Sequence, residues 1–378
     1  MPISVNGANG ITFADGSIQN TGAAGFGFKN RIINGAMVID QRNAGAAVTV
    51  NSTGQTYPVD RFFATGQSTD GVFTLQQSST APAGFVNSVV ATVTTADASI
   101  GVTQNYLFRQ RLEGYNIADL TWGIATAATV TLSFWVRSSL TGTFGGTLHN
   151  GNGDRFYPYS YTISAANTWE QKTITIAGDT TGTWEKTNGI GLNVIWSLGT
   201  GSTLLAPTSA WTATTYTGFT GQTNLIGTVG ATFYITGVQL EKGSQATAFD
   251  WRPYTTEQLL CYRYLPVFRA NENGSAYSNP IVQGSATALG TNTYMLFHHI
   301  VPTRVAPTGI TISAVGDLRF SNNDGNAPCT VNAGLASAGI YQSVWTFTVA
   351  SSRSGSTVPG WFYTGASGFY FYLTGCEL

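Results

Sequence analysis

The chain has 378 residues, only 9% of them charged, and its 17 lysines and arginines against 18 aspartates and glutamates leave a formal net charge of −1. This balance argues against nucleic-acid binding, which needs a basic surface, and an apolar content of 42% argues against disorder. Ordinary soluble domains carry roughly 25% charged residues. We therefore expect a surface built from neutral polar residues, a surface covered by partners, or both. The sequence shows no run of about 18 apolar residues, so we expect no membrane insertion.

Residues 1–56 read as an extended arm rich in Gly, Asn and Ala. Within it, the apolar residues of Ile11–Phe13 and Ile18 flank an Asp15-Gly16 pair, which is typical of a tight hairpin. The first residues, Met1–Gly7, lack the basic and apolar regions of a secretory signal, so we expect synthesis and folding in a cytoplasm. We predict that the arm attaches the chain to neighbouring proteins.

Residues 57–252 show the alternation that marks half-buried strands. Leu132, Phe134 and Val136 alternate with polar or aromatic residues, and similar runs cover 174–176 and 190–198. Gly-rich turns separate these runs. Many short strands of this kind predict an all-β sandwich or jelly-roll domain.

Aromatic side chains are the best candidates for ligand binding in this domain, because sugars stack on their apolar faces. If Leu132, Phe134 and Val136 face the core, Trp135 and Arg137 face outward. Tyr157, Tyr159 and Tyr161 also share one strand face. We predict these five residues as glycan-binding candidates, with packing between protomers as the alternative. We expect Trp169, Trp184 and Trp196 in the core.

Candidates for metal and catalytic chemistry are few. Asn150, Asn152 and Asp154 alternate on a Gly-rich loop and are a weak calcium candidate, with a plain hydrogen-bonded turn as the favoured alternative. Three cysteines (Cys261, Cys329 and Cys376) and three histidines provide no disulfide framework and no zinc spacing. Nucleophile-elbow, P-loop and zinc-protease motifs are absent. We therefore expect no cofactor, no catalytic residues and no enzymatic activity.

A single helix is predicted between two β regions. Residues 255–265 follow Pro253 and stop before Pro266, and Thr255 with Gln258 fits a capping box. We assign 253–266 as a junction helix that separates the domain at 57–252 from a C-terminal domain at 267–378.

The C-terminal region is again β-rich. Residues 361–364 and 369–373 flank a four-residue loop and predict a terminal hairpin that is aromatic on both faces. A strand that is apolar on both faces must be covered on both sides. We expect the second cover to come from another copy of the chain, through Trp361, Tyr363, Tyr370 and Tyr372.

Several segments carry motifs that together resemble those of one group of proteins. They are 11–17; 31–35 with 40–42 and 59–62; 112–114 with 130–138; 167–170, 182–184 and 189–198; 232–243, 246–247, 252–254, Cys261 and 263–264; and 299–302 with Arg304 and 306–308. Together they resemble a recurring module of bacteriophage virion proteins, chiefly tail-fibre and receptor-binding chains. The resemblance spans nearly the whole chain.

The resemblance implies a jelly-roll domain similar to carbohydrate-binding modules, followed by a trimeric β-rich end domain. It thereby predicts a non-enzymatic homotrimeric tail fibre or receptor-binding protein located in the virion. The arm at 1–56 would bind other virion proteins, and the protein would attach to a host-surface glycan or protein. Trp361, Tyr363, Tyr370 and Tyr372 would then pack the trimer or contact the receptor.

Two alternatives remain open. One is a capsid decoration or head-fibre protein. The other is a polysaccharide depolymerase tailspike, which would need two carboxylates across a cleft, such as Asp179 with Glu185.

Overall fold

A computed structural model describes the backbone of residues 4–6, 10–12, 18–19, 29–51, 54–66, 70–269, 286–322, 325–331, 334–364 and 370–378. It describes the side chains of the same residues except 4–19, 286–291, 316, 322, 325–327, 331, 351–361 and 363–364. The chain is all-β, with one α-helix in these residues.

The first half of the chain contains strands β1 Ser4–Asn6, β2 Gly10–Thr12, β3 Ile18–Gln19, β4 Val48–Val50, β5 Thr56–Val59, β6 Phe62–Gly66, β7 Val72–Ser78, β8 Ser88–Thr95, β9 Asn105–Glu113, β10 Val130–Ser138, β11 Gly142–Asn150, β12 Phe156–Ile163, β13 Glu170–Ile176 and β14 Ile190–Thr200. The second half contains β15 Leu205–Ala206, β16 Gly218–Phe219, β17 Thr232–Lys242, α1 Tyr254–Tyr262, β18 Val267–Arg269, β19 Ala286–His298, β20 Gly309–Ile312, β21 Leu318–Asn322, β22 Gly325–Val331, β23 Leu335–Ala338, β24 Gln342–Thr364 and β25 Tyr370–Thr374.

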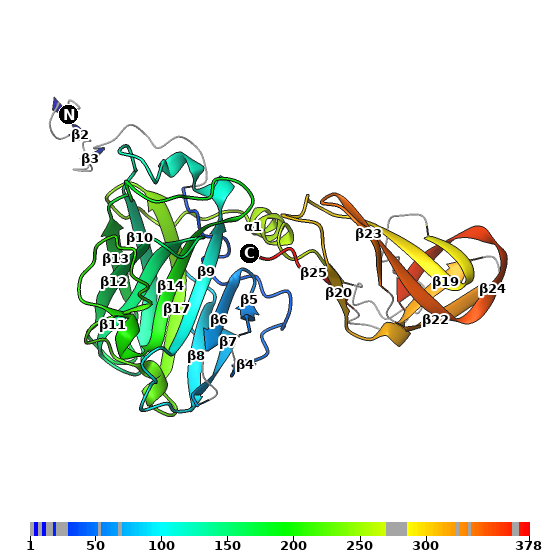
Figure 1. The fold of residues 1–378 in the computed structure, drawn as a ribbon, viewed down its shortest axis with the longest axis horizontal. Helices are drawn as coiled ribbons and strands as arrows, with labels where there is room; N and C mark the ends of the chain where they lie inside the picture. The colour runs from blue at the N-terminus through cyan, green and yellow to red at the C-terminus, as the bar shows by residue number, and fades with distance from the viewer. Residues whose placement is uncertain are drawn as a thin grey trace.

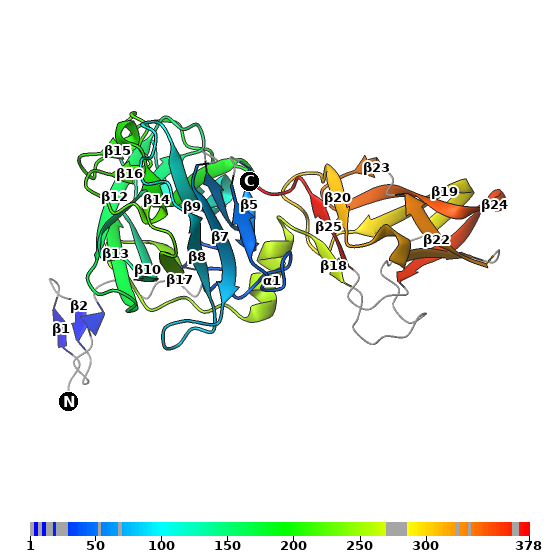
Figure 2. The same ribbon diagram turned by 90° about the horizontal axis from the view of Figure 1, so that it is seen from below.

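Two six-stranded antiparallel sheets form a jelly-roll sandwich (Figures 1 and 2). Sheet I has the order β13-β10-β17-β8-β7-β4, and sheet II has the order β12-β11-β14-β9-β6-β5. Their inner faces enclose the largest apolar core, where Phe134 of β10 packs edge-on against Trp196 of β14 with ring centroids 5.6 Å apart. The alternation at 132–136, 174–176 and 190–198 predicted β10, β13 and β14, and these strands are confirmed.

The N-terminal region contains a small sheet and a segment that belongs to the sandwich. Strands β1, β2 and β3 pair only with one another among the described residues, and β2 pairs antiparallel with β3, with Thr12 opposite Ile18. The chain therefore reverses between these strands, but the register differs by one residue from that of a two-residue Asp15-Gly16 turn. The Asp15-Gly16 turn itself lies outside the described residues.

The predicted arm of 1–56 is too long. The main-chain N–H of Arg31 donates to the carbonyl of Leu240 on β17, at 2.9 Å, and Ile32 and Met37 are fully buried in the sandwich core. Strand β4 is an edge strand of sheet I. The sandwich therefore begins near residue 29, because this segment supplies core side chains and a strand.

Helix α1 follows the sandwich and is shorter than predicted. It begins at Tyr254 and ends at Tyr262, and no side chain caps its N-terminus, so the predicted capping box of Thr255 and Gln258 is wrong. Pro253 occupies the N-cap position instead. None of the helices in the described ranges has the length and hydropathy needed to cross a membrane.

The C-terminal domain is a smaller sandwich that lies beyond α1 in Figure 1. A three-stranded sheet, β18-β25-β20, packs against a five-stranded sheet built around β19 and β24. Phe371 of β25 stacks on Phe268 of β18 at 4.7 Å, within the core between these sheets.

The predicted terminal hairpin of 361–364 with 369–373 is wrong. Strand β25 pairs with β18 and β20, whereas the end of β24 pairs with β21, so the two segments belong to different sheets. The residues between them, 365–369, lie outside the described ranges. Proximity along the chain suggested a pair, but β25 crosses to the opposite sheet, where it buries Phe371 and Leu373.

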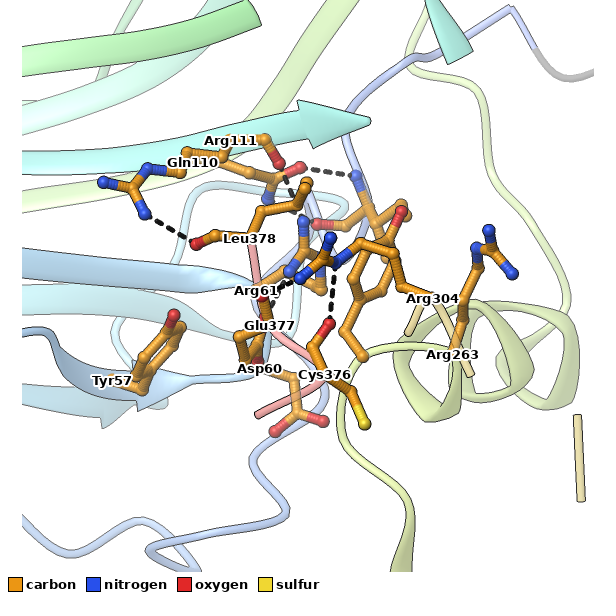
Figure 3. A network of polar contacts seen from close by, with 12 residues as sticks. Tyr57, Asp60, Arg61, Gln110, Arg111, Arg263, Arg304, Cys376, Glu377 and Leu378 are labelled. Atoms are coloured by element: carbon orange, nitrogen blue, oxygen red, sulfur yellow. Dashed lines mark hydrogen bonds and ion pairs between the residues drawn. The ribbon is translucent and has the colours of Figure 1, made fainter. Parts of the chain in front are cut away.

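A network of ion pairs and hydrogen bonds joins the sandwich, α1 and the C-terminal tail (Figure 3). Glu377 pairs with both Arg42 and Arg61 of the sandwich. Arg304 donates to the carbonyl oxygens of Cys376 and Glu377, at 2.9 and 2.6 Å. We call this set the junction network, together with Asp60, Glu113, Arg263 and Tyr264.

Apolar contacts reinforce the junction network. Leu378 of the tail packs in one buried cluster with Ile33 and Ile39 of the N-terminal segment and with Cys261 and Tyr264 from α1 and the turn that follows it. The tail is therefore part of the interface between the two domains.

Candidate functional site

Trp135 lies on the outer face of sheet I, as its position in the alternation predicts. Its neighbours Phe134 and Val136 are fully buried in the sandwich core, and successive side chains of a strand point to opposite faces. Trp135 is half-buried and pairs directly with Gln171 on the edge strand β13. An indole ring and an amide group thus lie side by side on this face.

A β-bulge in β17 shapes the surface beside Trp135. The register with β10 shifts between Ser133 and Trp135, so that two residues of β17 lie opposite one residue of β10. Gly237 occupies the bulge with φ of 60°, a conformation that glycine adopts readily. A Cβ atom here would come within 2.7 Å of the Phe85 ring and 2.9 Å of the Trp135 ring. The glycine therefore lets both rings lie directly against the backbone.

Three further aromatic residues complete a groove above the bulge. Phe85 precedes β8, and Phe249 and Trp251 lie in the segment between β17 and α1. Ring centroids are 5.2 Å apart for Phe85 and Phe249, 5.0 Å for Phe85 and Trp251, and 4.8 Å for Phe249 and Trp251. Trp251 is 55% exposed despite its size. The groove has a volume of about 260 Å³ and is lined by Ala83, Gly84, Phe85, Ser133, Trp135, Gln171, Gly237, Thr247, Phe249 and Trp251. We call it the aromatic groove.

A second hollow of about 200 Å³ lies on the other side of Phe249 and Trp251. Its two acidic side chains are already bound. Asp250 accepts from the main-chain N–H of Lys29 at 2.8 Å, and Glu257 forms an ion pair with Arg252 at 3.0 Å. These carboxylates hold the N-terminal segment and α1 in place.

Arg137 shares the outer face with Trp135 but does not line the aromatic groove. Its Nε donates to the carbonyl of Asn167 at 2.9 Å, and its guanidinium lies 4.9 Å from the Tyr234 ring centroid. Trp169 also packs edge-on against Tyr234, at 6.1 Å. Trp169 is half-buried on this surface, so its prediction as a core residue is wrong, whereas Trp184 and Trp196 lie in the core.

Tyr159 and Tyr161 are not surface residues, and their prediction as glycan-binding residues is wrong. They are 1% and 6% exposed, and the Tyr159 hydroxyl donates to the carbonyl of Ile195 at 2.7 Å. Tyr157 shares their strand face, as predicted, and packs half-buried against Trp211 with centroids 5.3 Å apart. The alternation of β12 identified the shared face, but that face is the one that packs into the core.

Asn150, Asn152 and Asp154 belong to a hydrogen-bonded turn. The Asn150 side-chain oxygen accepts from the main-chain N–H groups of Asp154 and Arg155, both at 3.1 Å, and its amide donates to the Asp154 carboxylate. Within the residues searched, no group of three or more His, Cys, Asp or Glu side chains could hold a metal ion. The turn alone accounts for the geometry of Asn150 and Asp154.

Tyr370 and Tyr372 lie on the face of β25 opposite the C-terminal core. They are half-buried and stack in parallel at 6.3 Å, with Arg269 5.2 Å from the Tyr370 ring. The side chains of Trp361 and Tyr363 lie outside the described residues. The contribution of these four aromatics to a trimer stays a prediction.

Phe85, Phe249 and Trp251 were missed because nothing in their local sequence relates them to Trp135. Phe85 lies about 50 residues before Trp135, and Phe249 and Trp251 lie more than 100 residues after it. One signal was available, since Gly237 interrupts the alternation of the strand beside β10, and an isolated glycine in a strand suggests a bulge.

Comparisons with known proteins give structural likenesses only. No family model matches the chain, and no curated protein sequence matches it. Among solved structures, a putative sugar-binding protein from Bacteroides thetaiotaomicron matches 57% of this chain and 100% of its own length, at 14% identity and a TM-score of 0.34. A family 11 carbohydrate-binding module from Clostridium thermocellum, in complex with a mixed-linked tetrasaccharide, matches 54% of this chain and 100% of its own, at 12% identity and a TM-score of 0.26.

The enzymatically active domain of tailspike protein 4 from bacteriophage CBA120 is also similar. It matches 57% of this chain at 13% identity and a TM-score of 0.31, and the match covers 22% of the tailspike chain. At these identities and scores, none of the likenesses assigns a ligand or an activity.

Proposed function

We propose that the aromatic groove binds a carbohydrate, and that the chain is a non-enzymatic bacteriophage virion protein, a homotrimeric tail fibre or receptor-binding protein. The virion role is proposed from the motifs that resemble those of phage tail-fibre chains. The carbohydrate role is proposed from the groove itself.

One observation carries the carbohydrate proposal: indole and phenyl rings from three separate segments converge on one open groove beside amide and hydroxyl groups. Trp135 and Trp251 present apolar ring surface, and Gln171 is exposed at the rim. Sugar rings have apolar C–H faces that stack on such rings, and their hydroxyls bond to amides.

The composition of the groove supports a binding role rather than a catalytic one. Its ten lining residues include no Asp, Glu or His. Glycoside hydrolysis ordinarily uses two carboxylates about 5–9.5 Å apart. Asp179, one member of the pair considered from the sequence, is 2% exposed and forms a bidentate contact with Arg155 at 2.6 and 2.8 Å.

The carbohydrate proposal is tested by replacing groove rings and measuring binding to an array of bacterial surface polysaccharides. We expect Trp135→Ala and Trp251→Ala each to weaken binding at least tenfold, because a lost stacking contact is worth about 0.5–1.5 kcal/mol beyond its buried area. Tyr115→Ala is the matched control, since Tyr115 is 61% exposed and does not line the groove. Equal binding by the wild type and all three variants would show that the aromatic groove is not the carbohydrate-binding site.

The virion proposal is tested separately. Light scattering at micromolar concentration should give the mass of three chains, and a stable monomer would refute the trimer. Counting copies per particle distinguishes a tail appendage, with a few tens or fewer, from capsid decoration, with hundreds. Release of new reducing ends from host polysaccharide would instead indicate a depolymerase.

A further inference from the structure

The outer face of sheet II, on the side of the sandwich away from the aromatic groove, carries a pair of arginines. Arg109 and Arg111 are two residues apart on β9, so both side chains point away from the core that holds Phe108 and Leu112. The strand register places Phe63 of β6 directly opposite Arg109. Each guanidinium lies 5.0 Å from the centroid of the Phe63 ring. Two positive charges therefore flank one phenyl ring.

The same register brings polar groups beside the arginines. Asn193 of β14 lies opposite Arg111, and His149 of β11 lies opposite Asn193, so all three form one row across the sheet. The His149 Nδ1 lies 2.7 Å from the carbonyl oxygen of Asn150, so this nitrogen carries the proton. Burial and the two nearby arginines lower the pKa of His149 to about 4, which keeps the ring neutral near pH 7.

The hydrogen bonds of the arginine pair leave donors unused. Arg109 donates to the hydroxyl of Thr65 at 2.7 Å, and its Nε is buried without a partner. Arg111 donates to the Asn193 side-chain oxygen at 3.2 Å and to the main-chain oxygen of Leu378 at 2.6 Å. A guanidinium has five N–H donors, and a buried donor without an acceptor costs about 1–3 kcal/mol.

No acidic side chain balances the charge of this pair. Within the described residues, no Asp or Glu forms an ion pair with Arg109 or Arg111, and the nearby Glu377 is shared by Arg42 and Arg61. The main-chain oxygen of Leu378 faces Arg111 alone. Burial and the charge of Arg111 lower the pKa of Arg109 to about 10, so both guanidiniums remain charged near neutrality. Arg109 is therefore a half-buried cation that no acidic side chain neutralises, and it lies beside a second cation on the same strand.

We propose that Arg109 and Arg111, with Phe63 between them, form a binding site for an oxyanion: a carboxylate, sulfate or phosphate group. Arginine matches planar and tetrahedral oxyanions because its parallel N–H groups bind two oxygens at once. The site is independent of the aromatic groove, which lies on the opposite outer face of the sandwich. Two sources of the anion are open to experiment, a free inorganic ion and an acidic sugar of a larger ligand.

The test compares Arg109→Gln with the wild type by calorimetry and thermal unfolding, at constant ionic strength in chloride. The probes are inorganic sulfate, inorganic phosphate, a hexuronic acid tetrasaccharide and a neutral tetrasaccharide. Arg137→Gln is the matched control, because Arg137 is also half-buried over an aromatic ring but lies on the outer face of sheet I. We expect the wild type and Arg137→Gln to bind at least one anionic probe and Arg109→Gln to bind it at least tenfold more weakly.

The comparison among the four probes identifies the source of the anion. Binding of the hexuronic acid probe at least tenfold tighter than that of sulfate and phosphate indicates an acidic sugar, and equal binding indicates a free ion. Without anion, Arg109→Gln should unfold at no lower temperature than the wild type, since it removes an uncompensated charge. If Arg109→Gln does not fold, Arg109→Lys, which keeps the charge but loses the paired donors, replaces it with the same expected weakening. Absence of binding by the wild type, or equal binding by the variants, would overturn the proposal.

Discussion

The aromatic groove and the junction network use opposite chemistry. The groove is lined by rings, small residues and neutral polar groups, and one of its two indole rings, Trp251, is more than half exposed. The junction network gathers charged side chains that are mostly buried and mostly paired, such as Arg61 with Glu377 and Arg263 with Glu113. The charged pairs of the junction network thus join segments that are distant in sequence.

This difference separates two uses of polar groups in the chain. Paired buried charges specify which segments meet, because an unpaired partner would be costly. The aromatic groove on sheet I is lined instead by rings, small residues, hydroxyls and one amide. Exposed Gln171, Thr173 and Thr175 on the edge strand β13 illustrate this neutral polar exterior.

The largest expected effect comes from breaking the junction network at Glu377. Glu377→Gln removes the carboxylate that pairs with both Arg42 and Arg61, and the Arg61 side chain is only 3% exposed. Removing one partner of a buried pair typically costs about 3–5 kcal/mol of unfolding free energy. Denaturant unfolding followed by tryptophan fluorescence measures the loss.

Lys242→Ala provides the control for this comparison. Lys242 and Asp119 are each about half exposed and lie 3.7 Å apart, so their loss should cost about 1 kcal/mol or less. Equal losses in the two variants would mean that burial does not distinguish the junction network from ordinary surface pairs.

The second effect is a pH dependence that arises at Asp60. Burial raises the pKa of this carboxyl to about 6, from 3.8, although Arg42 and Gln41 oppose the shift. The folded protein therefore holds this proton more tightly than the unfolded chain does. Its contribution to stability is present below about pH 4 and is lost as the pH rises through 6.

Asp60→Asn isolates this contribution. The unfolding free energy of Asp60→Asn minus that of the wild type should rise by about 3 kcal/mol between pH 4 and 7, as a shift of roughly two units implies. Urea unfolding at four pH values in this range measures the difference. A difference that stays constant with pH would show that Asp60 does not titrate as its burial demands.

The smallest expected effect concerns the groove. Gly237→Ala places a methyl group against the rings of Phe85 and Trp135 and should cost about 1–3 kcal/mol more than Gly230→Ala. Both glycines have positive φ, 60° and 76°, but nothing lies within 4 Å of a Cβ at Gly230. Thermal unfolding and polysaccharide binding of the two variants separate backbone strain from disruption of the groove. Equal unfolding temperatures and equal binding for the two variants would show that the rings of Phe85 and Trp135 move aside without a measurable cost.

The sequence predicted what depends on local periodicity. Alternation predicted β10, β13 and β14, and it placed Trp135 on the outer face on the condition that Leu132, Phe134 and Val136 face the core, which they do. The same reasoning found that Tyr157, Tyr159 and Tyr161 share a face but assigned it to the wrong side. A period of two says which residues lie together and not which way they point, unless a neighbouring apolar run decides it.

What depends on topology could not be predicted. Arg42 meets Glu377 across a separation of 335 residues, and Phe85 meets Trp251 across more than 160. The prediction of a terminal hairpin was wrong for the same reason, since β25 pairs with β18 and β20 rather than with β24, its neighbour in sequence. The resemblance to phage virion chains predicted the jelly roll but not the residues that line its groove.

The return of residues 376–378 to the sandwich has a mechanical consequence. The C-terminal domain is connected to the sandwich through α1 and, after β25, through the tail held by Arg42, Arg61 and Arg111. A pulling force on that domain is divided between the covalent connection through α1 and the ion pairs and hydrogen bonds that hold the tail. Two attachment points restrict bending between the domains more than one would, because a single connection can act as a hinge.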